Sequence, residues 1–459
     1  MGKSIVVIGG GPGGYVAAIR AAQLKNEVTL IEKDELGGTC LNRGCTPTKL
    51  LVQSANAFWK VKNSAAWGIS ANDLSFDYSV AVKRKHEVVK KLVGGVGMLM
   101  KKNKIKVIKG TAIVESPQDV RVYESGEKIK ADAIVIASGS VPAPLSIEGV
   151  DSEGVINSNE ALEMTTLPKS VLIIGAGVYG IEFAQILSRL GVKVTVVEMM
   201  PNILPTVDKE AVIVMEKLLV NEGIKIITDA SVNGIKKKSG ELIVFLETKN
   251  GKDEIGVDKV LIGVGRRPQI AGLGIEALGV KVEKGFISVN DRMETSVPGI
   301  YAIGDVVGKS MLAHVASAEG KCAAENASGS TTAMDYRAIP RCIYTSPEIA
   351  SVGLTESDAR ERYGDKILIG KFPMVGNSMS AIIGETSGFV KIIAEPKYGE
   401  VLGVLIVGSH ATELIAEAVL GIQMEATYDD FSRTIHAHPT VSEAIMEAAL
   451  GVEGKSFHI

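Results

Sequence analysis

Cysteine is scarce in this chain, with only four among 459 residues. A secreted scaffold held together by disulfides needs a denser supply, so the composition excludes that class. Apolar runs long enough to span a bilayer are missing, and the start lacks a cleavable leader, since Lys3 passes directly into a strand. We therefore expect a cytoplasmic protein without a membrane segment.

Charge of one sign is not in excess either. The formal net charge is −3, which offers no attraction to a nucleic acid. Short basic runs occur at 83–85, 101–104 and 236–238, and we interpret them as solvated faces and turns rather than nucleic-acid patches. Hydrophobic residues make up 46% of the chain, an ordinary globular mixture, and the length suffices for about three domains.

Glycine, in contrast, is abundant, and part of it forms a pattern that occurs twice. Each copy has a buried strand (4–8, 170–174), a glycine turn, helical spacing (15–24, 181–190) and a second strand (27–31, 192–197) before an acid. The glycines are Gly9, Gly11 and Gly14, then Gly175, Gly177 and Gly180, and the acids are Glu32 and Glu198. First glycine and acid lie 23 residues apart in both copies (9 to 32, 175 to 198). This is the dinucleotide fingerprint in its required setting, so we predict two separate dinucleotide domains.

The residue types explain how such a site works. The first glycine makes the turn, the second lets the backbone approach a pyrophosphate, and the third lets the helix pack on the strand. Glu32 and Glu198 are placed to accept hydrogen bonds from a ribose. Glu198 also carries negative charge where a 2′-phosphate would lie, and residues 199–202 contain no arginine. The second site is therefore predicted to prefer NAD over NADP.

Two of the cysteines, Cys40 and Cys45, stand five positions apart after the first fingerprint. Pro47 is tolerated only in the first turn of a helix, so we expect a helix to start near Cys45, where its positive end stabilises a thiolate. A disulfide across so short a loop suits electron exchange better than strength. Two free thiols, or half of a metal site, are the alternatives. Because Cys322 and Cys342 are too scattered for a zinc quartet, we predict no metal.

Two dinucleotide sites beside reactive cysteines imply a two-electron relay. A disulfide exchanges electrons with thiols, a nicotinamide carries hydride, and a flavin couples the two reactions. The first fingerprint adjoins the cysteines, so it is expected to hold FAD, and the second fingerprint is expected to hold NAD.

Other segments are assigned more coarsely. Residues 54–106 are expected to be largely helical, with Met98, Leu99 and Met100 in the core, and strands are expected at 106–112, 119–123 and 131–140. A hairpin is predicted at 239–240. Asp305, which follows a strand at 300–303 and Gly304, either caps the helix around 312–327 or holds a ligand hydroxyl, and the residues alone favour capping. After a break at 328–332 the pattern indicates strands and two helices.

His438 also has more than one interpretation. Pro439 holds it extended, and Thr440 with Glu443 forms a capping-box signature, which favours a helix start with exposed histidines. Metal binding by His436 and His438 lacks further ligands nearby. The remaining reading is an acid–base histidine oriented by Glu443.

Over nearly its whole length the chain resembles the flavin-dependent pyridine nucleotide–disulfide oxidoreductases. The resemblance rests on both fingerprints with their acids and on 38–49, 264–268, 301–305, 311–314, 345–348 and 438–443. It implies an α/β fold with two Rossmann-like dinucleotide-binding domains, for FAD and NAD, plus a C-terminal α+β dimerisation domain. The implied boundaries are 1–145 and 269–338 for the two FAD-binding parts, 146–268 for the NAD-binding domain and 339–459 for the dimerisation domain.

The resemblance also implies a role for single residues. Cys40 is the sulfur that substrate thiolate attacks, Cys45 faces the flavin, and Lys49 lies near flavin N5, paired with Glu182. His438 of the partner subunit, held by Glu443, deprotonates the incoming thiol, so the active site needs a homodimer. The implied cofactor-binding set is Gly9, Gly11, Gly14, Glu32, Gly38, Thr39, Lys49, Thr111, Ala112, Ser138, Gly139, Asp305 and Ala313 for FAD, and Gly175, Gly177, Gly180, Glu182, Glu198 and Gly265 toward the second site.

The activity that the resemblance implies is oxidation of protein-bound dihydrolipoyl groups by NAD⁺, as the third component of 2-oxo acid dehydrogenase or glycine cleavage systems. There are three alternatives. An NADPH-dependent glutathione reductase is disfavoured because no arginine follows Glu198, and a mercuric reductase would need a C-terminal cysteine pair. The third alternative is a non-catalytic flavoprotein scaffold. Many relatives carry valine in place of Arg43. The charge of Arg43 beside the thiolates is expected to shift their redox poise or the substrate tolerance.

Overall fold

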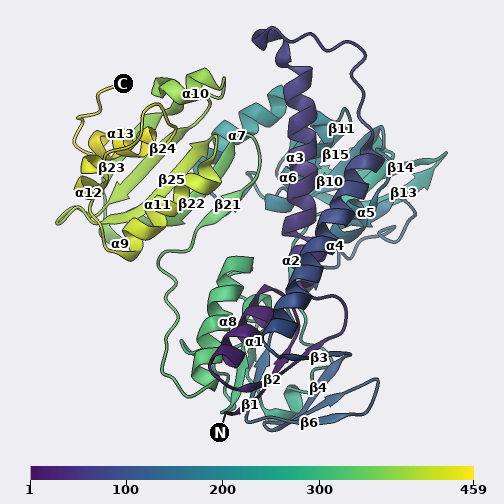
Figure 1. Cartoon of the computed structure of the whole chain (residues 1–459). Helices are drawn as coiled ribbons and strands as arrows, with labels where there is room; N and C mark the ends of the chain where they lie inside the picture. The colour runs from purple at the N-terminus through teal and green to yellow at the C-terminus, as the bar shows by residue number, and fades with distance from the viewer. Residues whose placement is uncertain (1) are drawn as a thin grey trace.

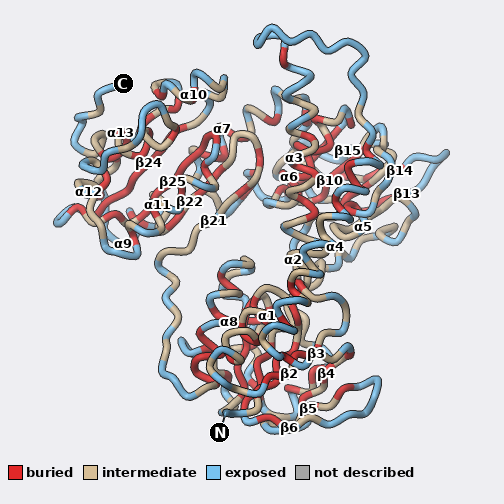
Figure 2. Tube along the Cα trace, viewed as in Figure 1, coloured by how far each residue is buried: buried red, intermediate tan, exposed pale blue. Residues whose placement is uncertain are grey.

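The computed structural model describes residues 2–459, which form three lobes (Figure 1). The lower lobe contains the first glycine fingerprint and helix α8, the lobe at the upper right contains the second fingerprint, and the C-terminal residues form the lobe at the upper left. Buried residues follow the sheet of each lobe (Figure 2). The predicted fold class, two dinucleotide-type α/β units and a C-terminal α+β unit, is confirmed.

The first lobe is built on a parallel sheet with the strand order β20-β7-β1-β2-β3. Its strands are unbroken apolar runs because both faces are covered: helices α1 and α8 pack on one face, and the antiparallel sheet β4-β5-β6 packs on the other. A Cβ on Gly320 of α8 would lie 2.4 Å from the carbonyl oxygen of Gly13, so glycine allows the two helices to touch. The bounds are β1 (Ser4–Ile8), α1 (Pro12–Gln23), β2 (Glu27–Glu32), β3 (Lys106–Lys109), β4 (Ala112–Ser116), β5 (Asp119–Val122), β6 (Lys128–Lys130), β7 (Ala133–Ile136), β18 (Val282–Glu283), β19 (Phe286–Ile287), β20 (Ile300–Ala302) and α8 (Ala313–Ala327).

The second lobe repeats this arrangement. Its parallel sheet has the order β12-β11-β10-β16-β9, with α6 on one face and the antiparallel sheet β13-β14-β15 on the other. The chain enters the lobe through β8 and leaves it through β17, and these two strands pair antiparallel. The bounds are β8 (Ser140–Pro142), β9 (Val155–Asn157), α5 (Ser158–Glu163), β10 (Ser170–Ile174), α6 (Val178–Arg189), β11 (Lys193–Val197), α7 (Lys209–Asn221), β12 (Lys225–Ile227), β13 (Ala230–Lys238), β14 (Glu241–Thr248), β15 (Gly251–Val257), β16 (Lys259–Ile262) and β17 (Arg266–Pro268).

The third lobe has an antiparallel sheet with the order β21-β22-β25-β24-β23. Over residues 339–459, all of which the structure describes, it carries five helices, so the expectation of two was wrong. Three of them are eight residues or shorter, which is too short for helical periodicity to show in the sequence. The bounds are β21 (Arg341–Ile343), β22 (Glu348–Gly353), α9 (Glu356–Tyr363), β23 (Leu368–Pro373), α10 (Ser378–Ile382), β24 (Phe389–Ala394), β25 (Val401–Gly408), α11 (Ala411–Gln423), α12 (Tyr428–Arg433) and α13 (Glu443–Gly451).

A buried cation fastens the third lobe to the second. The Lys391 side chain on β24 is 1% exposed, and its Nζ donates to Asp208 at 2.9 Å and Glu210 at 2.7 Å, at the start of α7. It also donates to Glu356 of α9 at 3.0 Å. A buried charge held in this way keeps the two lobes in a fixed relation, because separating them would remove Asp208 and Glu210 and leave the ammonium group with Glu356 alone.

Two long helices, α3 (Cys45–Lys62) and α4 (Tyr78–Lys102), run from the first lobe along the second (Figure 1). On α4 the prediction of three core residues was wrong for two of them, because Met98 is 68% and Leu99 42% exposed, whereas Met100 is 1% exposed. Consecutive residues of a helix point in different directions, so one apolar stripe cannot bury all three.

Several predicted boundaries need correction. The strand expected over 106–112 breaks at Gly110, where the chain leaves the parallel sheet for β4. Both fingerprint helices begin three residues earlier than expected, at Pro12 and Val178, whereas the hairpin at Ser239–Gly240 is confirmed.

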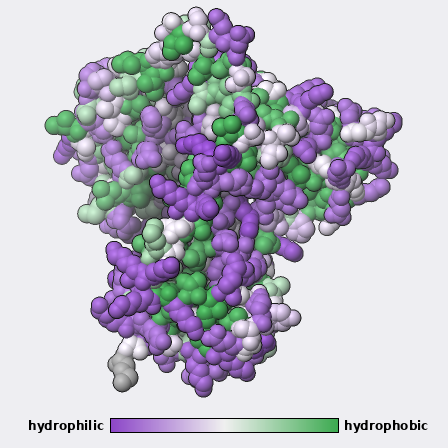
Figure 3. All heavy atoms as spheres, turned by 45° about the vertical axis from the view of Figure 1, so that its right-hand side comes forward, coloured by the Kyte–Doolittle hydropathy of each residue, from purple (hydrophilic) through white to green (hydrophobic). Residues whose placement is uncertain are grey.

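Within residues 2–459 no helix has the length and apolar character to cross a membrane. On the face in Figure 3, hydrophobic residues come to the surface in separate patches between hydrophilic ones.

Candidate active site

One cavity of about 1390 Å³ lies where the lobes meet, well above the roughly 300–1,000 Å³ of a common small-molecule pocket. Predicted site residues in its wall are Gly9, Gly11, Glu32, Gly38, Thr39, Cys40, Cys45, Lys49, Thr111, Ala112, Ser138, Gly139, Gly175, Gly177, Glu182, Glu198, Gly265, Asp305 and Ala313. Gly14 and Gly180 lie behind the two loops. His438 and Glu443 belong to the third lobe, and the fold does not bring them to the cavity of their own chain.

The two glycine loops have the same construction. A Cβ on Gly14 would lie 1.8 Å from the oxygen of Gly9, and a Cβ on Gly180 2.0 Å from that of Gly175, so the third glycine of each copy admits no side chain. Each acid fastens its own loop through both carboxylate oxygens. Glu32 accepts from the N–H groups of residues 10 and 34 at 2.6 and 2.7 Å, and Glu198 from those of residues 176 and 200 at 2.7 and 2.9 Å.

The residues in the cavity wall fit dinucleotide cofactors. The Ser138 hydroxyl is buried and has no hydrogen-bond partner among residues 2–459, so a polar group in the cavity would satisfy it. Gly139, Gly177 and Gly265 face open space, where an added Cβ would meet no atom within 4 Å. Backbone N–H groups at a helix N-terminus beside such space are suited to a pyrophosphate. The first lobe would hold FAD and the second NAD.

The cysteines are carried by two consecutive helices, α2 (Gly38–Arg43) and α3. A Cβ on Gly38, whose φ is +55°, would lie 2.6 Å from the Cα of Gly11, so glycine lets α2 touch the first fingerprint loop. Cys45 is the first residue of α3, as expected from Pro47, and it therefore sits at the positive end of that helix.

The two thiols are free in this structure and differ in acidity. Cys40 donates a hydrogen bond to the sulfur of Cys45, and together with burial this raises the pKa of Cys40. The same hydrogen bond, against the opposing effect of burial and with help from the Lys49 charge, lowers the pKa of Cys45 to about 7. One thiolate and one thiol at neutral pH are the state that a reactive dithiol needs.

Lys49 connects the redox helix to the second lobe. It lies one turn after Cys45 on α3, and its Nζ donates to both oxygens of Glu182 on α6, at 3.0 and 2.8 Å. Glu182 is 2% exposed, so the pair is shielded on the carboxylate side. The predicted pairing of these two residues is present in the geometry.

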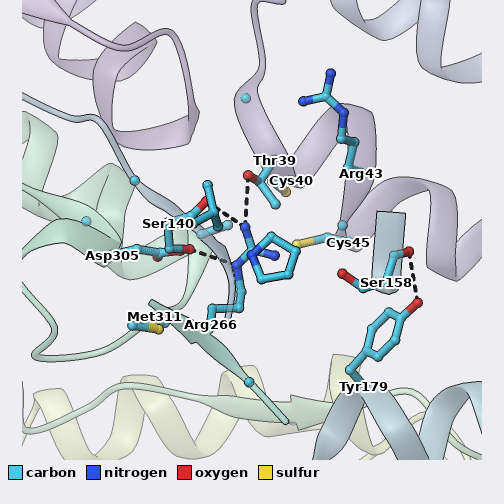
Figure 4. Close-up of a pocket in the computed structure, with 18 of the residues that line it drawn as sticks. Thr39, Cys40, Arg43, Cys45, Ser140, Ser158, Tyr179, Arg266, Asp305 and Met311 are labelled. Atoms are coloured by element: carbon cyan, nitrogen blue, oxygen red, sulfur yellow. Dashed lines mark hydrogen bonds between the residues drawn. The ribbon is translucent and has the colours of Figure 1, made fainter. Parts of the chain in front are cut away.

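Arg266 is the residue that sequence reasoning missed. Its Nε donates to the hydroxyl of Ser140 at 2.7 Å, its Nη2 donates to the carbonyl oxygen of Ser140 at 2.7 Å and to Thr39 Oγ1 at 3.3 Å, and the Ser140 hydroxyl donates to Asp305 (Figure 4). Burial lowers the pKa of Arg266, while the charges of Asp305 and Cys45 oppose that effect. The Gly-Arg-Arg-Pro motif marked the position of Arg266 in the sequence. Its contact with Ser140 could not be predicted from that motif, because only the pairing of β8 with β17 brings the two residues together.

Asp305 does not cap a helix, so the interpretation favoured by the residues alone was wrong. Helix α8 starts at Ala313 without a side-chain cap, eight residues further on. The Asp305 carboxylate instead lies in the cavity wall. The turn that carries it is held from behind by the buried Glu319, which accepts from the N–H of Gly304 at 2.6 Å and from the hydroxyl of Tyr336 at 2.7 Å.

Arg43 lies in the cavity wall but does not act as a free charge. Its guanidinium forms an ion pair with Asp34, and in Figure 4 its side chain points away from Cys45 and Arg266. The cation that faces the Cys45 sulfur is Arg266, together with Lys49. The expectation that the Arg43 charge shifts the redox poise of the cysteines therefore has little geometric support.

His438 and Glu443 lie together at the start of α13. Glu443 Oε1 accepts from His438 Nδ1 at 2.9 Å, and Oε2 accepts from the N–H of Thr440 at 2.9 Å. The capping box expected from Thr440 does not form as predicted. The N–H of Thr440 does bind Glu443, but the helix begins at Glu443 itself, so Ser442 and not Thr440 precedes its first residue. Burial raises the pKa of Glu443, but its two donors outweigh burial and hold it below the usual range. His438 keeps 70% of its side chain exposed.

His436, the other half of the His-x-His pair, is engaged differently. Its Nε2 contacts Glu417 at 3.1 Å, and this carboxylate raises the pKa of His436. The described residues 2–459 contain no group of three histidine, cysteine, aspartate or glutamate side chains arranged to hold a metal ion.

Comparison with known proteins divides the chain in two. Residues 3–320 match the family described as pyridine nucleotide-disulphide oxidoreductase, and residues 339–449 match the dimerisation domain of that family. The second match supports a homodimer.

Relatives and solved structures are similar over nearly the full length. A protein from Thermus scotoductus is 45% identical over 99% of this chain and 98% of its own, and one from Bacillus subtilis is 42% identical with the same coverage. Both carry the name dihydrolipoyl dehydrogenase. LpdA from Mycobacterium tuberculosis has a TM-score of 0.90 at 26% identity, and the HOCl-induced flavoprotein disulfide reductase RclA from Escherichia coli has 0.87 at 27% identity, each over 97% of this chain and 99% of the other.

Proposed function

The chain belongs to the pyridine nucleotide-disulphide oxidoreductase family, and we propose that its substrate is the protein-bound dihydrolipoyl group, which it oxidises with NAD⁺ as a dihydrolipoyl dehydrogenase. It is a flavin-dependent enzyme whose cofactors are FAD and NAD. The observation that carries the proposal is the position of Cys45, whose pKa is lowered to about 7, in the wall of the cavity that both glycine loops also line.

The chain's own residues perform the thiol chemistry. With Cys40 and Cys45 joined as a disulfide, a substrate thiolate attacks the Cys40 sulfur, and Cys45 leaves as a thiolate at the positive end of α3. The second substrate thiol then attacks the mixed disulfide, forms the cyclic lipoyl disulfide and releases Cys40. Two electrons have passed from the substrate to the cysteine pair, and the two substrate protons have been removed. A bound FAD, held by the first glycine loop and Glu32, would supply the two-electron redox chemistry that links this dithiol to NAD⁺.

Proton removal is assigned to His438 of the partner subunit. His438 lies far along the chain from the cavity residues, in the lobe that matches the dimerisation domain, and its exposed ring is available to a second copy. Glu443 orients the ring through Nδ1, which leaves Nε2 to accept a proton from the substrate thiol. The proposal therefore places each active site at the interface of two subunits.

The proposed division of labour follows the same boundaries as the sequence prediction. Residues 1–145 and 269–338 would hold FAD, 146–268 would hold NAD, and 339–459 would form the subunit interface. Glu198, which lies beside the exposed Met199 and Met200 and has no arginine nearby in sequence, supports NAD over NADP. The lipoylated proteins of 2-oxo acid dehydrogenase or glycine cleavage systems are the proposed partners, in the cytoplasm.

A paired assay tests this function. Purified enzyme with FAD is given dihydrolipoamide with NAD⁺ or NADP⁺, and in parallel glutathione disulfide with NADH or NADPH. We expect rapid NAD⁺ reduction by dihydrolipoamide and little activity in the other three combinations. A preference for NADPH and glutathione disulfide would overturn the proposal, and a flavin-containing protein inactive in all four would indicate a scaffold. Cys40→Ser serves as the inactive control.

A further inference from the structure

Tyr344 stands directly behind the redox site without lining the cavity. It lies in the loop between β21 and β22, in the lobe that matches the dimerisation domain. The Lys49 Nζ is 4.5 Å from the centroid of its ring. A cation within about 6 Å of an aromatic face is attracted to it by the ring quadrupole. The third lobe therefore contacts the lysine of the redox helix in its own chain.

The loop that carries Tyr344 is held in place by α6. The N–H of Tyr344 donates to Glu182 Oε1 at 3.0 Å, so one buried carboxylate receives both Lys49 and the Tyr344 backbone. Two residues later the N–H of Ser346 donates to Gln185 at 2.8 Å, and its carbonyl oxygen accepts from Gln185 at 2.9 Å. The ring is thus presented to Lys49 by a backbone with little freedom to move.

We propose that Tyr344 is a positioning residue for the redox site, whose ring face holds the Lys49 ammonium group beside Cys40 and Cys45. A lysine has a flexible four-carbon stem, so a carboxylate alone leaves its ammonium group free to rotate about the pair. Glu182 holds the group from one side and the ring covers it from another. Because 30% of the Lys49 side chain remains exposed, removal of the ring opens a path for the ammonium group to turn toward water.

The charge balance around Cys45 makes this arrangement measurable. Cys45 faces Cys40 from α2, Lys49 from its own helix, Glu182 from α6 and Arg266 from β17. Of these groups, Lys49 is the cation that lowers the pKa of Cys45, and Glu182 opposes it. If the ammonium group moves away while Glu182 stays, the Cys45 thiolate loses stabilisation. The inference rests on the proposed redox role of Cys45.

The experiment compares Tyr344→Leu with Tyr344→Phe in the FAD-containing enzyme. Each protein is reduced, freed of reductant and treated with iodoacetamide over a range of pH, and alkylation of Cys45 is followed by peptide mass spectrometry. Tyr344→Phe keeps the ring face and should reproduce the wild-type profile. Tyr344→Leu should raise the apparent pKa of Cys45 by about half a unit to one unit, which slows alkylation below pH 7 about threefold to tenfold.

A double-variant cycle separates positioning from a general structural effect. In a Lys49→Met background the ring has no ammonium group to hold, so Tyr344→Leu should produce no further change in the Cys45 profile. Should Tyr344→Leu lose FAD or unfold, Tyr344→Met takes its place. Identical profiles for wild type and the aliphatic variant would overturn the inference, as would a shift of equal size in Tyr344→Phe or in the Lys49→Met background.

The readout is independent of the proposed substrate. Alkylation uses neither dihydrolipoamide nor NAD⁺, so the expected difference between the leucine and phenylalanine variants persists even if the enzyme prefers another disulfide. Conversely, dihydrolipoamide oxidation with NAD⁺ in the wild type stands even if the ring proves to have no influence on Cys45.

Discussion

Replacement of Glu443 by glutamine gives the sharpest test of how the proposed acid–base histidine is oriented. In the structure the two carboxylate oxygens of Glu443 each accept one hydrogen bond, from His438 Nδ1 and from the N–H of Thr440, both at 2.9 Å. A glutamine side chain has one oxygen and one NH₂ group. Whichever way it turns, its NH₂ group faces a donor, so one of the two hydrogen bonds is lost along with the negative charge.

The magnitude follows from the kind of interaction removed. A hydrogen bond to a charged group contributes about 1.5–3 kcal/mol, which corresponds to about a tenfold to hundredfold loss in rate if it acts on the transition state. At the proposed interface a partner subunit would shield the pair from water, and we apply this range to the dimer for that reason. We expect Glu443→Gln to lower kcat for dihydrolipoamide oxidation by that factor, with FAD content unchanged.

The same helix supplies a matched control. Glu447, one turn further along α13, also divides its carboxylate between a histidine and a backbone N–H, since it accepts from His458 Nδ1 at 2.6 Å and from the N–H of Phe457 at 2.9 Å. We expect Glu447→Gln to reduce thermal stability about as much as Glu443→Gln does, but to leave kcat near that of the wild type. If the two variants lose the same activity, the loss reports helix stability, and the proposed role of Glu443 is refuted.

Three further predictions concern the cavity. In the reduced enzyme, iodoacetamide should label Cys45 with a midpoint near pH 7, because the thiolate forms above that pH, while Cys40 should react only at much higher pH; a single midpoint shared by both thiols would contradict the assignment. Glu198→Ala should raise KM for NAD⁺ about tenfold to hundredfold, the effect of one charge-assisted hydrogen bond to the ribose, with FAD absorbance unchanged as the control. Gly14→Ala should abolish FAD binding and Gly180→Ala the NAD⁺-dependent step alone, since the new Cβ would lie 1.8 and 2.0 Å from a backbone oxygen; retention of both functions would show that the loops can move apart.

Local patterns in the sequence predicted the parts of the site that depend on local structure. A glycine fingerprint specifies a strand, a turn and a helix within about 30 residues, so both loops and the acids Glu32 and Glu198 could be located in advance. Pro47 likewise predicted the helix start at Cys45. These signals succeed because the backbone conformation they require is set by neighbours in the chain.

Residues whose surroundings come from distant segments could not be assigned in this way. Arg266 meets Ser140 only because β8 and β17 pair, and the position of Tyr344 against Lys49 depends on the packing of three lobes. For Asp305, a nearby helix suggested capping, but seven residues lie between Asp305 and Ala313, where α8 begins. Glu443 was expected either to take part in a capping box or to orient the histidine, yet its two oxygens accept from both the N–H of Thr440 and His438.

The antiparallel crossing of β8 and β17 also makes the second lobe an insertion with a single point of entry and exit. A homologous unit with different coenzyme preference could therefore be transplanted between Pro142 and Arg266 while the sheet of the first lobe stays unbroken. Such a graft would succeed only if the donor brought carboxylates for the two lysines that cross the lobe boundaries, Lys49 and Lys391. Coenzyme choice and cohesion of the molecule are thus separable by engineering, provided that these two ion pairs and the apolar contacts of the second lobe with α3, α4 and the third lobe are preserved.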